Sequence, residues 1–95
     1  MFIVSLTYVQ PLEKIDKYLT EHVNYLTEQY KAGNFIASGR KIPRTGGIIL
    51  SKMDSLEELK AVLKKDPFNR ENLATYDIQE FIPSMTSSEF ENLKE

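Results

Sequence analysis

The chain has 95 residues, no cysteine and a formal net charge of −2 at pH 7, which is the size of a single domain. Without cysteine it has no disulfides, thiolate metal sites or cysteine nucleophiles, and its small negative charge gives no attraction to nucleic acid or to anionic membrane surfaces. No apolar run approaches the roughly 20 residues of a membrane span, and the N-terminus lacks the basic start of a signal peptide. We therefore expect a cytoplasmic domain with neither nucleic acid nor membrane among its partners.

The first two predicted elements are a strand and a helix. Apolar and polar residues alternate from Phe2 to Tyr8, which is the period of a half-buried strand. From Pro11 to Ala32 the apolar residues return every three or four positions, as on one face of an amphipathic helix. The apolar stripe of this helix consists of Leu12, Ile15, Leu19, Val23, Leu26 and Tyr30.

Two short strands and a second helix follow. Residues 35–39 and 47–53 are apolar segments bounded by glycine and turn residues, and both segments predict strands. Ser55 and Glu58 have the spacing of a capping box at the start of the next helix. Pro67 ends that helix, because proline disfavours helical backbone at the residue before it.

Residues 75–82 alternate again and predict the fourth strand, so the elements run β-α-β-β-α-β. This order is that of the ferredoxin-like fold, an α+β architecture with two helices on one face of a four-stranded antiparallel sheet. We expect one domain over residues 1–83, followed by a tail or a short helix over residues 84–95.

The third predicted strand is apolar on both of its sides. Ile48, Ile49 and Leu50 are consecutive, and consecutive strand residues point to opposite faces of the sheet. The pattern therefore predicts burial of both faces, although helices cover only one. In so small a chain the simplest second cover is another subunit, so we expect a homodimer formed through the helix-free face of the sheet.

The only histidine, His22, lies within the apolar stripe of the first predicted helix. Leu19 and Leu26 lie three and four residues from it and share its face. An imidazole with the ordinary pKa of about 6.5 exchanges protons near neutral pH, and a buried imidazole needs a partner. Asp66, at the end of the second predicted helix, is a candidate for that partner. The alternatives are that His22 is a satisfied core residue and that Asp66 is a turn residue bonded to nearby backbone.

Several short motifs, in order and at matching intervals, resemble the YciI-like (YCII-related) family. The motifs are Glu21-His22, Tyr25-Leu26, Gly33-Asn34-Phe35, Ser38-Gly39, the run from Pro43 to Leu50, Asp66-Pro67-Phe68 and the run from Tyr76 to Phe81. The resemblance implies a dimeric α+β barrel of two ferredoxin-like subunits, with a His22–Asp66 pair as the catalytic feature of a pocket between sheet and helices. Two positions depart from the common pattern, since Arg40 stands where many members have proline and Leu19 where many have arginine.

Five further residues are candidates for binding a small-molecule ligand. Ser38 offers a hydroxyl and Gly39 its backbone, while Arg40 or Arg44 could supply the charge of the arginine that this chain lacks, and Phe68 would form a pocket wall. No strand–turn–helix elbow surrounds Ser38, which argues against a nucleophile. A single histidine without cysteine gives no metal site, and no cofactor-binding motif is present.

These observations leave two hypotheses for the function. In the first, the protein is a small cofactor-independent enzyme in which His22 transfers a proton and Asp66 orients the imidazole, in an isomerisation, elimination or lyase step on a small organic molecule. The class of reaction follows from the family resemblance. In the second, the protein is a non-catalytic ligand-binding or regulatory dimer with a structural pair. A pair that opens into a cleft would favour the first hypothesis, and a sealed pair the second.

Overall fold

Four strands form a single antiparallel sheet in the spatial order β2-β3-β1-β4. The computed structural model describes residues 1–95, and its strands are β1 (Phe2–Tyr8), β2 (Phe35–Arg40), β3 (Gly46–Ser51) and β4 (Ala74–Glu80). β1 lies in the middle and pairs with both β3 and β4. The predicted β-α-β-β-α-β order and the four-stranded antiparallel sheet are therefore confirmed.

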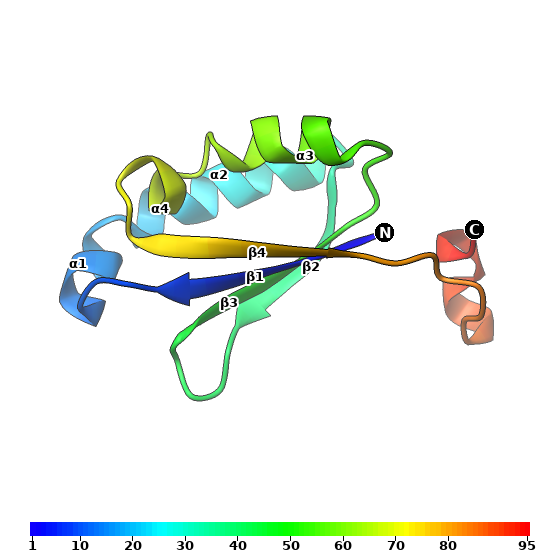
Figure 1. Cartoon of the computed structure of the whole chain (residues 1–95), viewed down its shortest axis with the longest axis horizontal. Helices are drawn as coiled ribbons and strands as arrows, with labels where there is room; N and C mark the ends of the chain where they lie inside the picture. The colour runs from blue at the N-terminus through cyan, green and yellow to red at the C-terminus, as the bar shows by residue number, and fades with distance from the viewer.

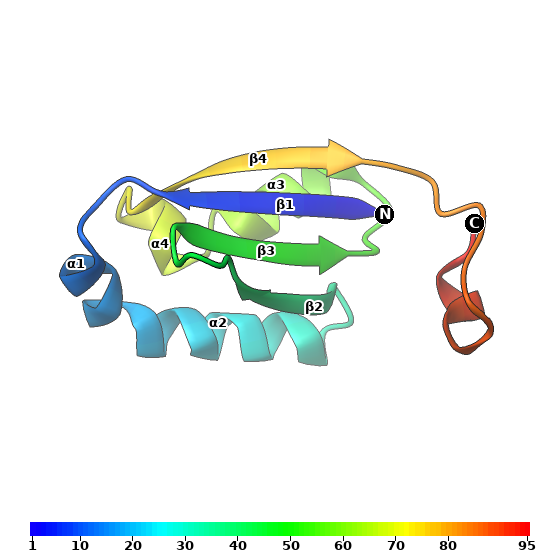
Figure 2. The same cartoon turned by 90° about the horizontal axis from the view of Figure 1, so that it is seen from below.

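The helices lie on one face of this sheet, as predicted (Figures 1 and 2). The two longer ones are α2 (Leu19–Lys31), beside β2, and α3 (Leu56–Leu63), behind β1 and β4. Ser55 caps α3 as expected, because its hydroxyl oxygen accepts a hydrogen bond from the N–H of Glu58 at 3.3 Å. None of the helices combines the length and the apolar character that crossing a membrane requires.

The first predicted helix is divided in two at Tyr18, which separates α1 (Leu12–Lys17) from α2. Tyr18 has φ −105° and ψ 3°, and its N–H bonds to the carbonyl of Ile15, three residues back. The break lets α1 turn away from α2 (Figure 2) and bury Ile15 completely. By contrast, α2 has no fully buried residue, so its apolar stripe is not part of the closed core.

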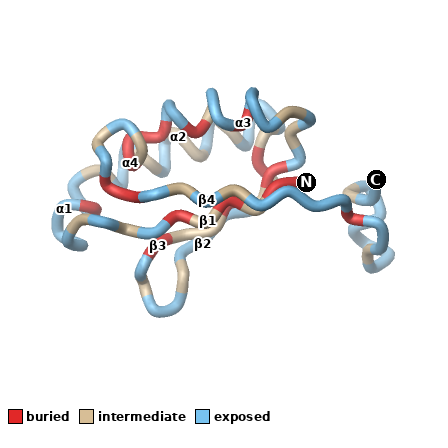
Figure 3. The backbone as a smooth tube through the Cα atoms, in the orientation of Figure 1, coloured by how far each residue is buried: buried red, intermediate tan, exposed pale blue.

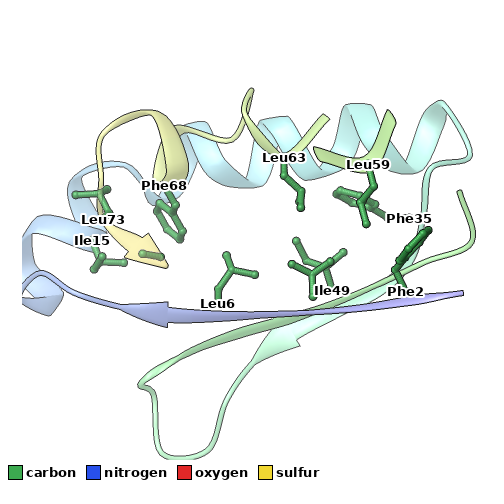
Figure 4. Close-up of a cluster of buried hydrophobic side chains, with 11 residues drawn as sticks. Phe2, Leu6, Ile15, Phe35, Ile49, Leu59, Leu63, Phe68 and Leu73 are labelled. Atoms are coloured by element: carbon green, nitrogen blue, oxygen red, sulfur yellow. The ribbon is translucent and has the colours of Figure 1, made fainter. Parts of the chain in front are cut away.

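The hydrophobic core lies between the helices and the covered face of the sheet (Figure 3). Its eleven residues are Phe2, Val4, Leu6, Ile15, Phe35, Ile49, Leu59, Leu63, Phe68, Leu73 and Ala74 (Figure 4). Val4 and Ile49 are directly opposite each other on β1 and β3, and both are buried. Their neighbours Ile48 and Leu50 therefore lie on the helix-free face, because strand side chains alternate.

A bulge changes the alternation within β2. Phe35 lies opposite Ser51, but Ala37 lies opposite Leu50, so two steps on β2 correspond to one step on β3. Such a bulge shifts the side chains that follow it to the other face. After the bulge, Ser38 and Arg40 share the covered face with Phe35.

The last residues extend away from the sheet. Beyond β4 the chain runs to a short 3₁₀ helix, η1 (Ser88–Leu93), which lies past the end of the sheet in both views (Figures 1 and 2). The N-terminal ammonium of Met1 lies 3.7 Å from Oε2 of Glu95. This contact joins the two termini without bringing the tail near α2.

Candidate functional site

Asp66 lies at the junction of α3 with a short helix, α4 (Pro67–Arg70). Pro67 takes the first helical position, where its missing N–H leaves no bond unmade. Oδ1 of Asp66 accepts a hydrogen bond from the N–H of Phe68 at 3.0 Å and so caps α4. The sequence predicted that Pro67 ends a helix, but α3 already ends at Leu63 and Pro67 begins α4. The Asp-Pro-Phe segment thus fixes the carboxyl group in the interior.

Three donors converge on the side chain of Asp66. Nδ1 of His22 lies 2.7 Å from Oδ1 although the two residues are 44 positions apart, and the hydroxyl of Tyr76 donates to Oδ2 at 2.5 Å. The N–H of Phe68 is the third donor. A buried carboxylate is costly unless its oxygens are hydrogen-bonded, and here both oxygens have partners. The sequence offered two roles for Asp66, as the partner of His22 or as a turn residue bonded to nearby backbone. Oδ1 fills both roles, because it bonds to Nδ1 of His22 and to the N–H of Phe68.

His22 lies on α2, and its two ring nitrogens have different surroundings. Nδ1 faces Asp66, whereas Nε2 has no hydrogen-bond partner. The imidazole stacks on Phe68 with ring centroids 3.9 Å apart and an interplanar angle of 6°. A carboxylate that accepts from Nδ1–H leaves Nε2 as the unprotonated nitrogen of the neutral ring. Nε2 is therefore the atom of this pair that can accept a proton from a ligand.

A cavity of about 170 Å³ lies against His22, between α2 and the sheet. Leu19, Val23 and Leu26 line it from α2, and Leu6 and Ile49 line it from the sheet. Eight of its thirteen lining residues are hydrophobic, so most of the wall suits the apolar part of a ligand. An apolar cavity of roughly 150 Å³ can hold benzene, and this cavity therefore has the size for one ring with small substituents.

The cavity contacts one end of the pair and not the other. The side chain of His22 is 12% exposed and lines the cavity, whereas that of Asp66 is 0% exposed and does not. The arrangement is thus closed behind the carboxyl group and open at the imidazole. This geometry matches a group that meets a ligand and is oriented from behind by a second group.

The structure brings four of the five sequence-predicted binding residues to this cavity, namely Ser38, Gly39, Arg40 and Phe68. The fifth, Arg44, does not line it. The guanidinium of Arg44 instead bonds to Asp16 on α1, with Nη2 and Oδ1 2.5 Å apart, and this bond raises the pKa of Arg44.

The sequence placed Tyr25 and Tyr76 within the family motifs, but it did not identify them as neighbours of the His22–Asp66 pair. Tyr76 bonds to Asp66 itself, and the hydroxyl of Tyr25 donates to the carbonyl oxygen of Val62 at 2.8 Å. Burial, and next the charge of Asp66, raise the pKa of both phenols above the ordinary value. The alternation of the last strand placed Tyr76 on one face, but only its register opposite Leu6 shows that this face is the covered one.

Comparisons with known proteins identify a family and a fold. A family model described as the YCII-related domain matches residues 1–82. No curated protein matches the chain. Among solved structures, the chain is similar to 5-chloro-2-hydroxyhydroquinone dehydrochlorinase (TftG) from Burkholderia phenoliruptrix AC1100 in complex with 2,5-dihydroxybenzoquinone, with a TM-score of 0.71 and 16% sequence identity. The similarity covers 85% of this chain and 93% of that chain, and at this identity it demonstrates a shared fold.

Proposed function

The chain belongs to the YCII-related domain family, and from this starting point we propose that it is a small enzyme in which His22 transfers a proton of a ring-sized organic molecule. One observation carries the proposal. Nε2 of His22 is without a partner on a ring that lines a cavity, while Nδ1 is held by the sealed Asp66. Nε2 is not among the buried polar atoms without a partner, so it is accessible from the cavity side and free to meet a ligand there.

The proposed mechanism begins with proton transfer from the substrate to Nε2 of His22. The imidazolium that forms is stabilised by Asp66, which also fixes the orientation of the ring. Ser38 and the backbone of Gly39 position the substrate, and Arg40 offsets the negative charge that develops on it. Return of the proton to another atom gives an isomerisation, and departure of a leaving group gives an elimination. A related fold in TftG serves a dehydrochlorinase, and loss of hydrogen chloride is an elimination of this kind.

We propose further that the protein is a homodimer joined through the helix-free face of its sheet. The register places Ile3 opposite Leu50 and Ser5 opposite Ile48 on this face, and all four residues are only partly exposed. A shallow hollow across β2 and β3 includes Ile48, Leu50 and Ala37, together with Ser38, Gly39 and Arg40. Burial of Ile3, Ile48 and Leu50 against a second copy would remove their apolar side chains from water.

A second candidate function is a binding module in which the pair is structural. The three donors on Asp66 favour this reading, because a satisfied buried network also stabilises a fold. Two variants separate the candidates. His22→Asn retains an amide donor for Asp66 but cannot transfer a proton, and Asp66→Asn removes the charge that orients the imidazole.

The experiment measures deuterium incorporation from D₂O into small cyclic ketones, lactones and hydroquinones, because this exchange reports proton abstraction without a net reaction. We expect the unaltered protein to catalyse exchange for some of these compounds and His22→Asn to lower that rate by about 100-fold or more, with its fold retained. Asp66→Asn should also lower the rate. If instead both variants lose about 1–3 kcal/mol of stability and exchange is the same with and without protein, the binding module is correct.

A further inference from the structure

The charges around the cavity are unbalanced. Arg40 is the one lysine, arginine or acidic residue among the lining residues, and no carboxylate oxygen lies within 4.0 Å of its guanidinium. The acidic residues on α2 are paired, Glu21 with Arg70 and Glu28 with Lys31. Asp66 is sealed behind His22, and Asp16 is paired with Arg44. A chain of net charge −2 thus has a cavity whose own charge is positive.

The β2 bulge sets the direction of this positive charge. Because the bulge shifts the strand, Ser38 lies opposite Ile49 and Arg40 opposite Gly47, and both side chains belong to the face covered by the helices. Ser38 is also fixed, since its hydroxyl oxygen lies 2.6 Å from that of Tyr30. The cavity is therefore polar and cationic on its β2 wall and hydrophobic on its α2 wall.

We propose that the ligand of this cavity is a small acid that binds as its anion, with its ionised oxygen on the guanidinium of Arg40 and its ring against α2. The inference rests on the proposed function and names its substrate class. A guanidinium presents N–H groups in a planar fork that matches a carboxylate, and it also donates to a phenolate or enolate oxygen. Leu19 and Val23 are 39% and 49% exposed, which leaves apolar surface for the ring of the ligand to cover.

The position of Arg40 also suits the proposed proton transfer. His22 on α2 and Arg40 on β2 belong to different walls of the same cavity. A molecule anchored by its anionic oxygen at one wall would present a more distant C–H or O–H group to Nε2 of His22. The same guanidinium would stabilise negative charge that develops on the substrate when the proton leaves.

The test compares benzoate with benzamide, which has nearly the same shape but no charge. Both probes are titrated into the full-length protein while the imidazole signals of His22 are followed by NMR, which needs no assignment because His22 is the only histidine. We expect the imidazole signals of His22 to shift when benzoate binds. Benzoate should bind at least about tenfold more tightly than benzamide. In Arg40→Gln this preference should disappear.

Arg44→Gln is the matched control, because Arg44 is a nearby arginine that does not line the cavity. It should keep the preference for benzoate. Arg40 makes no side-chain hydrogen bond or ion pair and is exposed, so Arg40→Gln should melt like the unaltered protein. Equal affinity for the two probes, no binding of benzoate, or a preference that persists in Arg40→Gln would overturn the inference. If the preference depends on Arg40 but His22→Asn leaves deuterium exchange unchanged, the ligand class stands and the proposed enzyme is refuted.

Discussion

Removal of the Tyr76 hydroxyl tests whether the Asp66 network is as closely coupled as its geometry indicates. In Tyr76→Phe the ring stays in place and only the hydrogen bond to Oδ2 of Asp66, 2.5 Å long, is lost. Tyr25→Phe is the matched control. It removes a bond of 2.8 Å to the neutral carbonyl oxygen of Val62 from the same region of the protein.

The expected magnitudes follow from the two acceptors. A hydrogen bond to a charged group contributes about 1.5–3 kcal/mol, and one to a neutral group about 0.5–1.5 kcal/mol. Because Asp66 is 0% exposed, Oδ2 cannot gain bulk water as a substitute, and the cost belongs in the upper part of its range. We therefore expect Tyr76→Phe to lower the free energy of unfolding by about 2–3 kcal/mol and Tyr25→Phe to lower it by about 1 kcal/mol.

Urea denaturation followed by circular dichroism measures both values at neutral pH. A double-mutant cycle adds a specific readout, because Tyr76→Phe should cost less in the Asp66→Asn background, where the acceptor is neutral. Equal losses in Tyr76→Phe and Tyr25→Phe would refute the reasoning. The same holds if the cost of Tyr76→Phe is unchanged by Asp66→Asn, since the hydroxyl would then act independently of the carboxylate.

Two further predictions concern pH and assembly. Burial and the charge of Asp66 raise the pKa of Tyr25 and Tyr76 above the ordinary value, so both phenols hold their protons in the folded protein where the unfolded chain loses them. Their contribution to stability is complete below about pH 10 and falls as the pH rises further, by about 1.4 kcal/mol per pH unit for each phenol. The urea midpoint should therefore fall above about pH 10, and less steeply in Tyr76→Phe. A urea midpoint that does not change with pH would contradict the raised pKa values of the two phenols. For the proposed dimer, sedimentation at micromolar concentration should give a dimer for the unaltered chain and monomers or insoluble protein for Ile48→Asp, and an unaltered chain that sediments as a monomer would disprove the pairing.

The sequence predicted the order of the elements because strand alternation and the helical stripe are local patterns. It did not predict the break at Tyr18, since the helical spacing of apolar residues continues through it and the break depends on the burial of Ile15. It also missed α4, because a helix of four residues has no periodicity to detect. The residue before Pro67 was identified, but as the end of one helix rather than the cap of the next.

The candidate site was predictable to a similar extent. His22 stood out as a polar residue in an apolar stripe, and Asp66 was named as its partner, but their contact depends on how α2 packs against the α3–α4 junction. The binding residues on β2 were harder to assign. Simple alternation would place Arg40 on the face opposite Phe35, and only the register shift of the bulge brings it to the cavity. Arg44 bonds to Asp16 instead of lining the cavity. This depends on the path of the loop between β2 and β3, which the sequence does not predict.

The half-exposed state of α2 has a consequence for the unliganded protein. α3 carries two fully buried residues, Leu59 and Leu63, whereas α2, which carries His22, has none and meets the core through the partly buried Tyr25 and Leu26. Apolar surface on α2, including that of Leu19 and Val23, is therefore left uncovered in the free domain. A ring bound in the cavity would bury these apolar residues and would add contacts between α2 and the sheet. Ligand binding would then also complete the packing of α2, so that α2 would be packed less tightly in the free domain than in the complex.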